Sequence, residues 1–258
     1  MAIAPGLKVS MAMALPGKEI YRGNDEFGPV HVFEDGIKRY LAFGRNDEQS
    51  CWLKTGPLVP QHEYSRAMLL VLLFCEPRQS LCLGLGAGVL NSCLHAHYPG
   101  LKQQVIELRP AVVEAAYRMF QLPRSKRLQL YTMDAFAYLA SDEGKRSDII
   151  FSDIYGEDGL DEQQLSEAFL AHCQRRLKPG GWLVLNCWRE HQGGDALARL
   201  KNIFADVRGC TTQSGNWLIF AGNRRDTQTG KQLKLKARDL SQKLGFNLSG
   251  HQGRLTEY

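Results

Sequence analysis

The stretch that most constrains the fold runs from Leu81 to Leu90. It reads Leu-Cys-Leu-Gly-Leu-Gly-Ala-Gly-Val-Leu, so a short apolar run leads into three glycines at alternate positions. A helical stretch follows, and a second apolar run ends in Glu107. The pattern predicts strand, tight turn, helix and strand, the first half of a nucleotide-binding βαβ fold. Glycines in such a turn let the backbone approach a ligand closely, because no Cβ stands in the way.

After this stretch the chain alternates regularly between apolar runs and helical patterns. We expect strands at 81–85, 104–107, 128–132, 148–152, 182–186, 207–210 and 217–221, and helices at 89–98, 111–120, 135–140, 162–177 and 195–204. Such alternation is typical of a Rossmann-like α/β fold with a largely parallel sheet. The last two strands are joined by a short hairpin-like turn, so we expect them to pair antiparallel.

The N-terminal part has a different texture. Two alternating runs, 29–34 and 37–43, flank Asp35-Gly36, a strong signal for a β-hairpin. A helix is expected over 62–74 and a basic amphipathic helix over 231–244. We therefore divide the chain into an arm and small antiparallel β unit (1–60), a Rossmann-like domain (61–223) and a basic helical tail (224–258).

Composition narrows the class of protein. No apolar run approaches the roughly 18 residues of a membrane span, and no signal peptide is expected. The 7 cysteines include no CxxC pair, which favours reduced thiols in the cytoplasm and no metal site. The net charge of +5 arises wholly from residues 224–258, so the body of the protein carries no broad basic face for nucleic acid.

Five motifs stand together in one order: residues 83–88, 105–107, 133–135, 148–153 and 177–184, behind Glu26-Phe-Gly-Pro29 and the Asp35-Gly36 hairpin. Over roughly residues 20–222 the chain resembles the spermidine synthase (polyamine aminopropyltransferase) family, most closely its divergent bacterial spermidine synthase-like members. The resemblance implies a class I methyltransferase-type sheet of seven strands with the last one antiparallel, preceded by a small β unit. Members of the family are often homodimers, so the resemblance also implies a homodimer. It further implies an adenosyl-sulfonium cofactor, either S-adenosylmethionine or its decarboxylated form.

The resemblance also assigns the cofactor residues. Gly84, Gly86 and Gly88 fit the turn over which the nucleoside lies, and Glu107 matches the acid that binds the ribose hydroxyls. Asp134 matches the acid that accepts from the adenine amino group, with the Ala135 amide as a donor to the ring. Two plainer interpretations remain open: Glu107 as an exposed charge at a strand end, and Asp134 as a helix N-cap. Val89 stands where a nicotinamide fingerprint requires glycine, which argues against a dehydrogenase.

Asp153 is the predicted catalytic residue, because it ends the fourth strand at the carboxyl edge where open α/β sheets place their sites. In the family an acid here binds the amine and accepts its proton. Tyr64, Tyr155, Glu157 and Asp158 are the predicted substrate-binding residues, and the nearby acids would attract a cationic amine. Tyr155 could equally serve as a lid residue. Of the further acids, Asp161 and Glu162 could simply cap the following helix.

Two positions depart from the aminopropyl-transferring pattern. Ala87 stands where those members carry an acid inside the glycine loop, and Gly156 stands where they carry a second acid after Asp153. Three functions therefore remain open. The first is alkylation of a small cationic amine of polyamine type. The second is methyl transfer to a small molecule or RNA. The third is a non-catalytic cofactor-binding relative.

Overall fold

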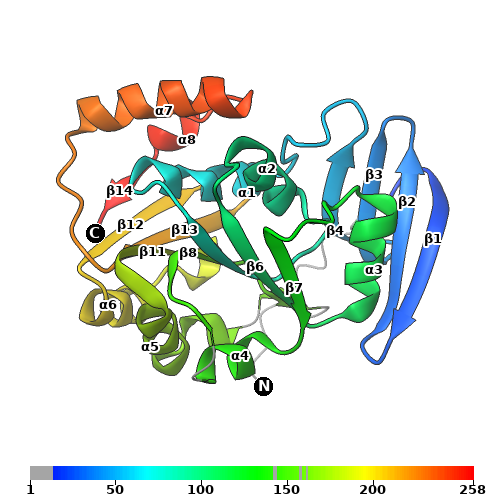
Figure 1. Ribbon diagram of the computed structural model, residues 1–258, viewed down its shortest axis with the longest axis horizontal. Helices are drawn as coiled ribbons and strands as arrows, with labels where there is room; N and C mark the ends of the chain where they lie inside the picture. The colour runs from blue at the N-terminus through cyan, green and yellow to red at the C-terminus, as the bar shows by residue number, and fades with distance from the viewer. Residues whose placement is uncertain (1–13, 142–143, 157–158, 161) are drawn as a thin grey trace, which may run out of the picture.

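The structure is a computed structural model of the whole chain, and it describes residues 14–141, 144–156, 159–160 and 162–258. Figure 1 shows a large mixed sheet with helices on both faces and a small antiparallel sheet at one side. The predicted α/β class and the small N-terminal β unit are confirmed.

The large sheet has the strand order β14-β12-β13-β11-β8-β5-β6-β7. Its strands are β5 (Gln79–Leu83), β6 (Lys102–Glu107), β7 (Leu128–Thr132), β8 (Ser147–Ser152), β11 (Leu177–Trp188), β12 (Asp206–Thr211), β13 (Asn216–Gly222) and β14 (Thr256–Glu257). The strands from β11 to β7 are parallel, and β13 is antiparallel to both β11 and β12, as expected. The sequence predicts seven strands, whereas the sheet has eight. The additional strand is β14, which adds two residues to the edge of β12, too few to leave a periodic signal in the sequence.

The helical segments are α1 (Glu63–Met68), η1 (Leu69–Leu73), α2 (Val89–His97), α3 (Pro110–Met119), α4 (Ala135–Ala140), η2 (Glu162–Leu165), α5 (Glu167–Arg176), η3 (Arg189–His191), α6 (Gly194–Ile203), α7 (Gly230–Leu244) and α8 (Ser249–Gln252). Two expected helices are broken. The one over 62–74 tightens into the 3₁₀ segment η1 after Met68. The one over 162–177 restarts at Ser166, whose hydroxyl accepts from the Phe169 amide at 3.2 Å and caps α5.

Both faces of the large sheet are buried. Along β5, Cys82 faces a core shared with α2 and α7, whereas Leu81 and Leu83 face a second core shared with α5 and α6. Since both faces are covered by apolar side chains, functional polar groups can gather only at the edges and ends of the strands.

The small sheet has four antiparallel strands in sequence order: β1 (Lys18–Asp25), β2 (Gly28–Asp35), β3 (Lys38–Gly44) and β4 (Asp47–Leu53). The predicted hairpin is confirmed, although its loop lies one residue later than expected. Asp35 pairs with Lys38, so the loop residues are Gly36 and Ile37. Two further short strands, β9 (Tyr155–Gly156) and β10 (Gly159–Leu160), pair antiparallel with each other.

Helix α3 fixes the small sheet to the large one. Its residues Ala111 and Val112 share an apolar cluster with Val30 and Leu41 of the small sheet. Beside this cluster, Arg109 pairs with Asp25 at 2.9 Å, and both side chains are less than a tenth exposed. This docking brings β4 against the carboxyl ends of the large sheet's strands.

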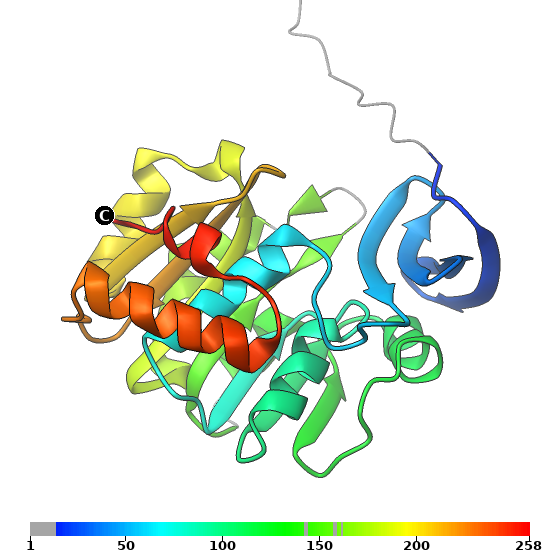
Figure 2. The ribbon, with the colours of Figure 1, turned by 90° about the horizontal axis from the view of Figure 1, so that it is seen from above.

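The C-terminal helix α7 packs on the outside of η1 and α2 (Figure 2). Leu233, Ala237, Leu240 and Leu244 are buried against the core, while the basic residues face outwards. Thr229 and Gln232 form a capping box at its start. Among the described residues, no helix is long and apolar enough to cross a membrane.

Candidate functional site

A cavity of about 810 Å³ opens where β5, β6 and β8 end and where β4 and α1 approach them. The predicted site residues that line it are Tyr64, Gly84, Gly86, Gly88, Glu107, Asp134, Ala135, Asp153 and Tyr155. Glu157 and Asp158, the other two predicted site residues, lie outside the described residues, as does Asp161. The fold therefore brings together every predicted site residue that the structure describes.

The glycine loop needs glycine for a structural reason at all three of its positions. Gly88 has φ +71°, and Gly84 and Gly86 show the reason most clearly. Gly84 has φ +90°, and a Cβ there would lie 2.3 Å from the Asp153 carbonyl oxygen. Gly86 has φ +55°, and a Cβ there would lie 2.6 Å from the Ser50 hydroxyl. All three φ values fall in the left-handed region, which residues other than glycine rarely adopt. The loop is thus held tightly between strand β8's end and strand β4.

Ser50 is a site residue that the sequence did not reveal. Its hydroxyl accepts a hydrogen bond from the Ala87 amide at 3.1 Å. Ala87 is 1% exposed, and its side chain belongs to the cluster that contains Val30 and Trp52. The position where the aminopropyl pattern has an acid therefore packs against the N-terminal sheet in this chain.

Glu107 ends β6 and is 8% exposed, so it is not the exposed strand-end charge considered above. One carboxylate oxygen accepts from the Leu85 amide and the other from the Arg109 amide, both at 2.9 Å. Burial raises the pKa of Glu107 above its ordinary value, and these backbone hydrogen bonds oppose that rise. Each oxygen keeps a second lone pair, which suits a pair of neighbouring hydroxyl donors.

Asp134 is the N-cap of α4, since its carboxylate accepts from the Ala137 amide at 2.7 Å. The capping interpretation is therefore confirmed. The side chain is exposed and borders the cavity, together with Ala135. Capping uses one lone pair of one oxygen, so the carboxylate retains capacity to accept from a ligand.

Asp153 follows β8 and lies at the centre of the cavity lining. Asn186, in β11, donates its amide hydrogen to the carboxylate at 2.8 Å. Burial raises the pKa of Asp153 to about 6, and hydrogen bonds from Asn186 and Tyr64 limit the rise. A carboxylate with this pKa is ionised at neutral pH yet binds a proton far better than an exposed aspartate.

Two tyrosines, Tyr64 and Tyr155, interact with this carboxylate. Burial, followed by the charge of Asp153, raises the pKa of Tyr64 well above its ordinary value, so the phenol stays protonated. The Tyr155 hydroxyl donates to the Asn186 carbonyl oxygen at 3.2 Å, and its ring meets Trp188 edge-on at 5.9 Å. Tyr155 is therefore anchored by its hydroxyl while its ring borders the cavity.

A second acidic group enters the cavity from β4. Glu48 lies 3.5 Å from the Nε2 atom of His62, and the His62 ring stacks on Tyr64 at 5.4 Å. Burial raises the pKa of Glu48, while burial and Arg66 lower the pKa of His62. Both shifts favour the neutral forms of the pair.

Asn186 and Glu48 left different traces in the sequence. Asn186 interrupts an apolar run at a strand's carboxyl end, the same signal that marked Asp153. Glu48 lies beside an irregularity in the β3–β4 register, which a single sequence does not announce. Among the described residues, no group of three or more histidine, cysteine, aspartate or glutamate side chains could hold a metal ion.

Comparison with known proteins places this geometry in a family. The model of the "Methyltransferase small domain" family matches residues 64–220, more than half of the chain. The polyamine aminopropyltransferase of Chromobacterium violaceum is 27% identical over 236 residues, which cover 88% of this chain and 89% of that protein. The polyamine aminopropyltransferase of Neisseria meningitidis is 26% identical over 176 residues, 67% of this chain and 66% of that protein.

Among solved structures, a probable spermidine synthase from Corynebacterium glutamicum has a TM-score of 0.74 at 19% identity, covering 88% of this chain and 87% of its own. At that level of identity the likeness concerns the fold, which is the class I methyltransferase-type fold implied by the motifs. The match to the family model and the sequence identity to the aminopropyltransferases support the same fold. This chain belongs to the methyltransferase small domain family and is a transferase related to the polyamine aminopropyltransferases.

Proposed function

We propose that this transferase alkylates a small cationic amine of polyamine type with an adenosyl-sulfonium co-substrate, S-adenosylmethionine or its decarboxylated form. Support comes from the relatives, which are named polyamine aminopropyltransferases, and from the cavity. The observation that carries the proposal is the buried Asp153 carboxylate, with a pKa near 6, in the same cavity as Glu107 and Asp134.

The donor set fits an adenosyl group. Glu107 offers two buried oxygens for the ribose diol, and Asp134 offers a carboxylate to an exocyclic amine. The glycine loop lies beside them with left-handed backbone and no side chain at 84, 86 or 88. Once bound, the co-substrate supplies an electrophilic carbon attached to a sulfonium sulfur.

Asp153 acts on the acceptor amine. An ammonium group has no lone pair, so it must lose a proton before its nitrogen can form a bond. Asp153 attracts the cation and takes that proton. The amine nitrogen is left with a free lone pair with which it can form a bond. Tyr64 and Asn186 hold the carboxylate in place, which keeps it aligned with the nitrogen that it deprotonates.

The remaining lining suits a cation. Tyr64 and Tyr155 border the cavity with their rings, which can bind an alkylammonium group face-on. Glu48 adds a carboxyl group to the lining. We keep Glu157 and Asp158 as further substrate-binding residues on their sequence position alone.

Methyl transfer is the second candidate. Ala87 favours it, because its side chain packs in the N-terminal cluster and the loop offers no carboxylate to the ammonium of an aminopropyl group. The matching family model also carries the methyltransferase name.

We further propose that the protein works in the cytoplasm as a homodimer. All seven cysteines are free thiols, as suits a reducing compartment. Multi-angle light scattering at micromolar concentration tests the dimer, since a monomer mass would overturn it.

Incubation with a diamine and each co-substrate in turn, followed by mass spectrometry of the products, tests the function. We expect a mass gain of one aminopropyl group with the decarboxylated form, or of one methyl group with S-adenosylmethionine. Asp153→Asn should lower turnover at least about 100-fold while keeping co-substrate affinity within a few-fold. Absence of both products with every small amine tried would overturn the proposal.

A further inference from the structure

Among the residues that the structure describes, the groups that interact with the Asp153 carboxylate are neutral. Asp153 influences the titration of Tyr64 (α1), Cys82 (β5), Tyr155 (β9) and Cys187 (β11), and the Asn186 amide (β11) donates to it. Burial raises the pKa of each of these phenols and thiols, so none of them carries a charge at neutral pH. Burial raises the pKa of Asp153, and the hydrogen bonds from Asn186 and Tyr64 lower it, so these two bonds tune how readily the carboxylate takes a proton.

A primary amide can present either of its two ends to a carboxylate. The NH₂ end donates a hydrogen bond and favours the ionised form, whereas the oxygen end repels that form. Asn186 is 1% exposed, so water does not decide between the two orientations. Its orientation depends on what holds the Asn186 oxygen.

Asn216 holds that oxygen. Its side-chain NH₂ donates to Asn186 Oδ1 at 3.0 Å, which leaves the Asn186 NH₂ directed at Asp153. The oxygen of Asn216 accepts from the Ser214 hydroxyl at 3.1 Å and from the Thr212 hydroxyl at 3.3 Å. In this arrangement the Asn216 oxygen faces the two hydroxyls and its NH₂ end faces Asn186.

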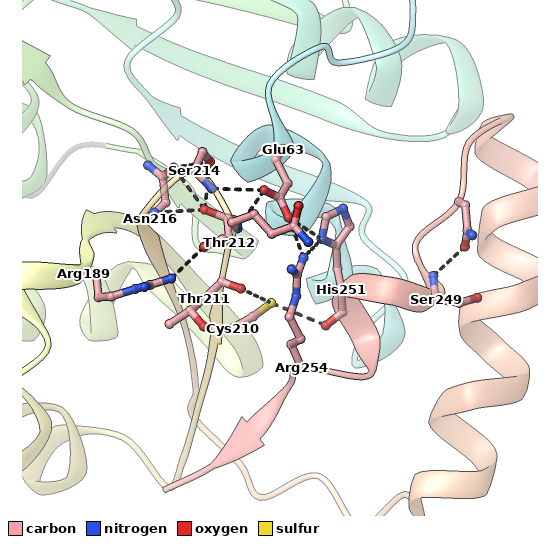
Figure 3. A network of polar contacts seen from close by, with 12 residues as sticks. Glu63, Arg189, Cys210, Thr211, Thr212, Ser214, Asn216, Ser249, His251 and Arg254 are labelled. Atoms are coloured by element: carbon pink, nitrogen blue, oxygen red, sulfur yellow. Dashed lines mark hydrogen bonds and ion pairs between the residues drawn. The ribbon is translucent and has the colours of Figure 1, made fainter.

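The turn that carries Asn216 is fixed in place by Glu63 (Figure 3). One carboxylate oxygen of Glu63 accepts from the amides of Gln213 and Ser214 at 2.8 and 3.3 Å. The other accepts from Arg254 of the C-terminal tail at 2.5 Å. Glu63 directly precedes Tyr64, so one carboxylate links the tail, the turn and the helix whose tyrosine bonds to Asp153.

We infer that Asn216 is a positioning residue for Asp153: it sets the polarity of the Asn186 amide, and the Glu63–Arg254 pair anchors the turn from which it acts. The inference rests on the proposed role of Asp153 as the base. It adds a means of setting the proton affinity of that base. The oriented amides of Asn216 and Asn186 keep the Asp153 carboxylate ionised until it receives a proton from the ammonium group.

Asn216→Asp reverses the direction of the hydrogen bond between positions 216 and 186 with almost no change in side-chain shape. A carboxylate at 216 accepts from the Asn186 NH₂, so the Asn186 oxygen turns towards Asp153. We expect the pKa of Asp153 to rise by at least about one unit, a tenfold gain in proton affinity. Because the variant also adds a buried charge, which raises the pKa by itself, the uncharged Asn216→Ala is measured beside it. Gln213→Glu, at an exposed position of the same turn, gives the effect of a more distant charge.

The measurement is a ¹³C NMR titration of the aspartate carboxyl carbons, with the Asp153 signal identified by its loss in Asp153→Asn. The inference is overturned if the rise in Asn216→Asp is no larger than that in Gln213→Glu. Should Asn216→Asp not fold, the uncharged Asn216→Ala carries the test. Asn186 is then free to turn, and an unchanged pKa contradicts the inference. The titration needs no ligand and no turnover. It therefore tests the influence of Asn216 on Asp153 separately from the proposed function.

Discussion

The hydroxyl of Ser50 accepts a hydrogen bond from the amide of Ala87 at 3.1 Å, and this contact closes the glycine loop against strand β4. Ser50 lies in β4 of the small sheet, and Ala87 lies in the loop that follows β5 of the large sheet. Through them the N-terminal sheet forms one wall of the cavity, and Ala87 belongs both to the cavity lining and to the apolar cluster that contains Val30 and Trp52.

The first prediction concerns Ala87. Ala87→Asp buries a carboxylate beside Val30 and Trp52 with no partner, so we expect a loss of about 3 kcal/mol in unfolding free energy and no gain of affinity for the decarboxylated co-substrate. Ala87→Ser, which adds only a hydroxyl, should cost about 1 kcal/mol. Urea unfolding and calorimetric titration measure the two effects. An Ala87→Asp variant as stable as the parent, with tighter binding, would mean that position 87 faces the ligand.

The second prediction concerns the cost of keeping Asp153 ionised. Its folded pKa of about 6 lies above the ordinary value of 3.8, so its contribution to stability is present at acid pH and is lost as the pH rises through about 6. Asp153→Asn removes this loss. We expect the variant to be inactive yet more stable than the parent at pH 8, by about 1–3 kcal/mol.

At pH 3.5 both proteins carry a neutral group at 153, so the stability difference should largely vanish. Urea unfolding at the two pH values provides the check. An equal stability difference at both pH values would show that the difference does not come from ionisation of Asp153. Activity of the parent should likewise rise with pH through about 6.

The third prediction concerns the C-terminal tail. Burial alone would raise the pKa of Glu63, but the Arg254 guanidinium and the amides of Gln213 and Ser214 lower it below its ordinary value. The contact therefore stabilises the protein at neutral pH, and its contribution is lost as the pH falls through the folded pKa of Glu63. We expect Arg254→Gln to cost about 1–2 kcal/mol at pH 7 and less at acid pH.

The control for this variant is Arg225→Gln, which breaks the exposed Arg225–Glu257 pair in the same tail. Such pairs contribute at most about 1 kcal/mol. Thermal unfolding distinguishes the two variants. Equal, small effects would show that the tail does not anchor the turn.

Much of the site could be predicted because it depends on local order along the chain. Gly84, Glu107, Asp134 and Asp153 each follow an apolar run, and in a parallel sheet all such ends meet at one edge. The order of strands and helices alone was therefore enough to bring these residues together.

The contacts that could not be predicted join distant parts of the chain. Arg254 and Glu63 are separated by 191 residues, and Ser50 and Ala87 by 37. Neither pair has a periodic or compositional signature, because each depends on how one sheet docks on another or how the tail returns to the body. The same reason hid Asn216, whose partner Asn186 lies on a neighbouring antiparallel strand.

The most direct test of the central claim is calorimetric titration with methylthioadenosine and S-adenosylmethionine. At least one should bind with micromolar affinity, and Glu107→Gln should weaken that binding about 10- to 100-fold, because a charge-assisted hydrogen bond to the ribose diol is lost. Glu114→Gln, on the exposed face of α3, should leave the affinity unchanged. Absence of binding by both ligands, or binding that Glu107→Gln does not weaken, would contradict the assignment of this cavity to an adenosyl group.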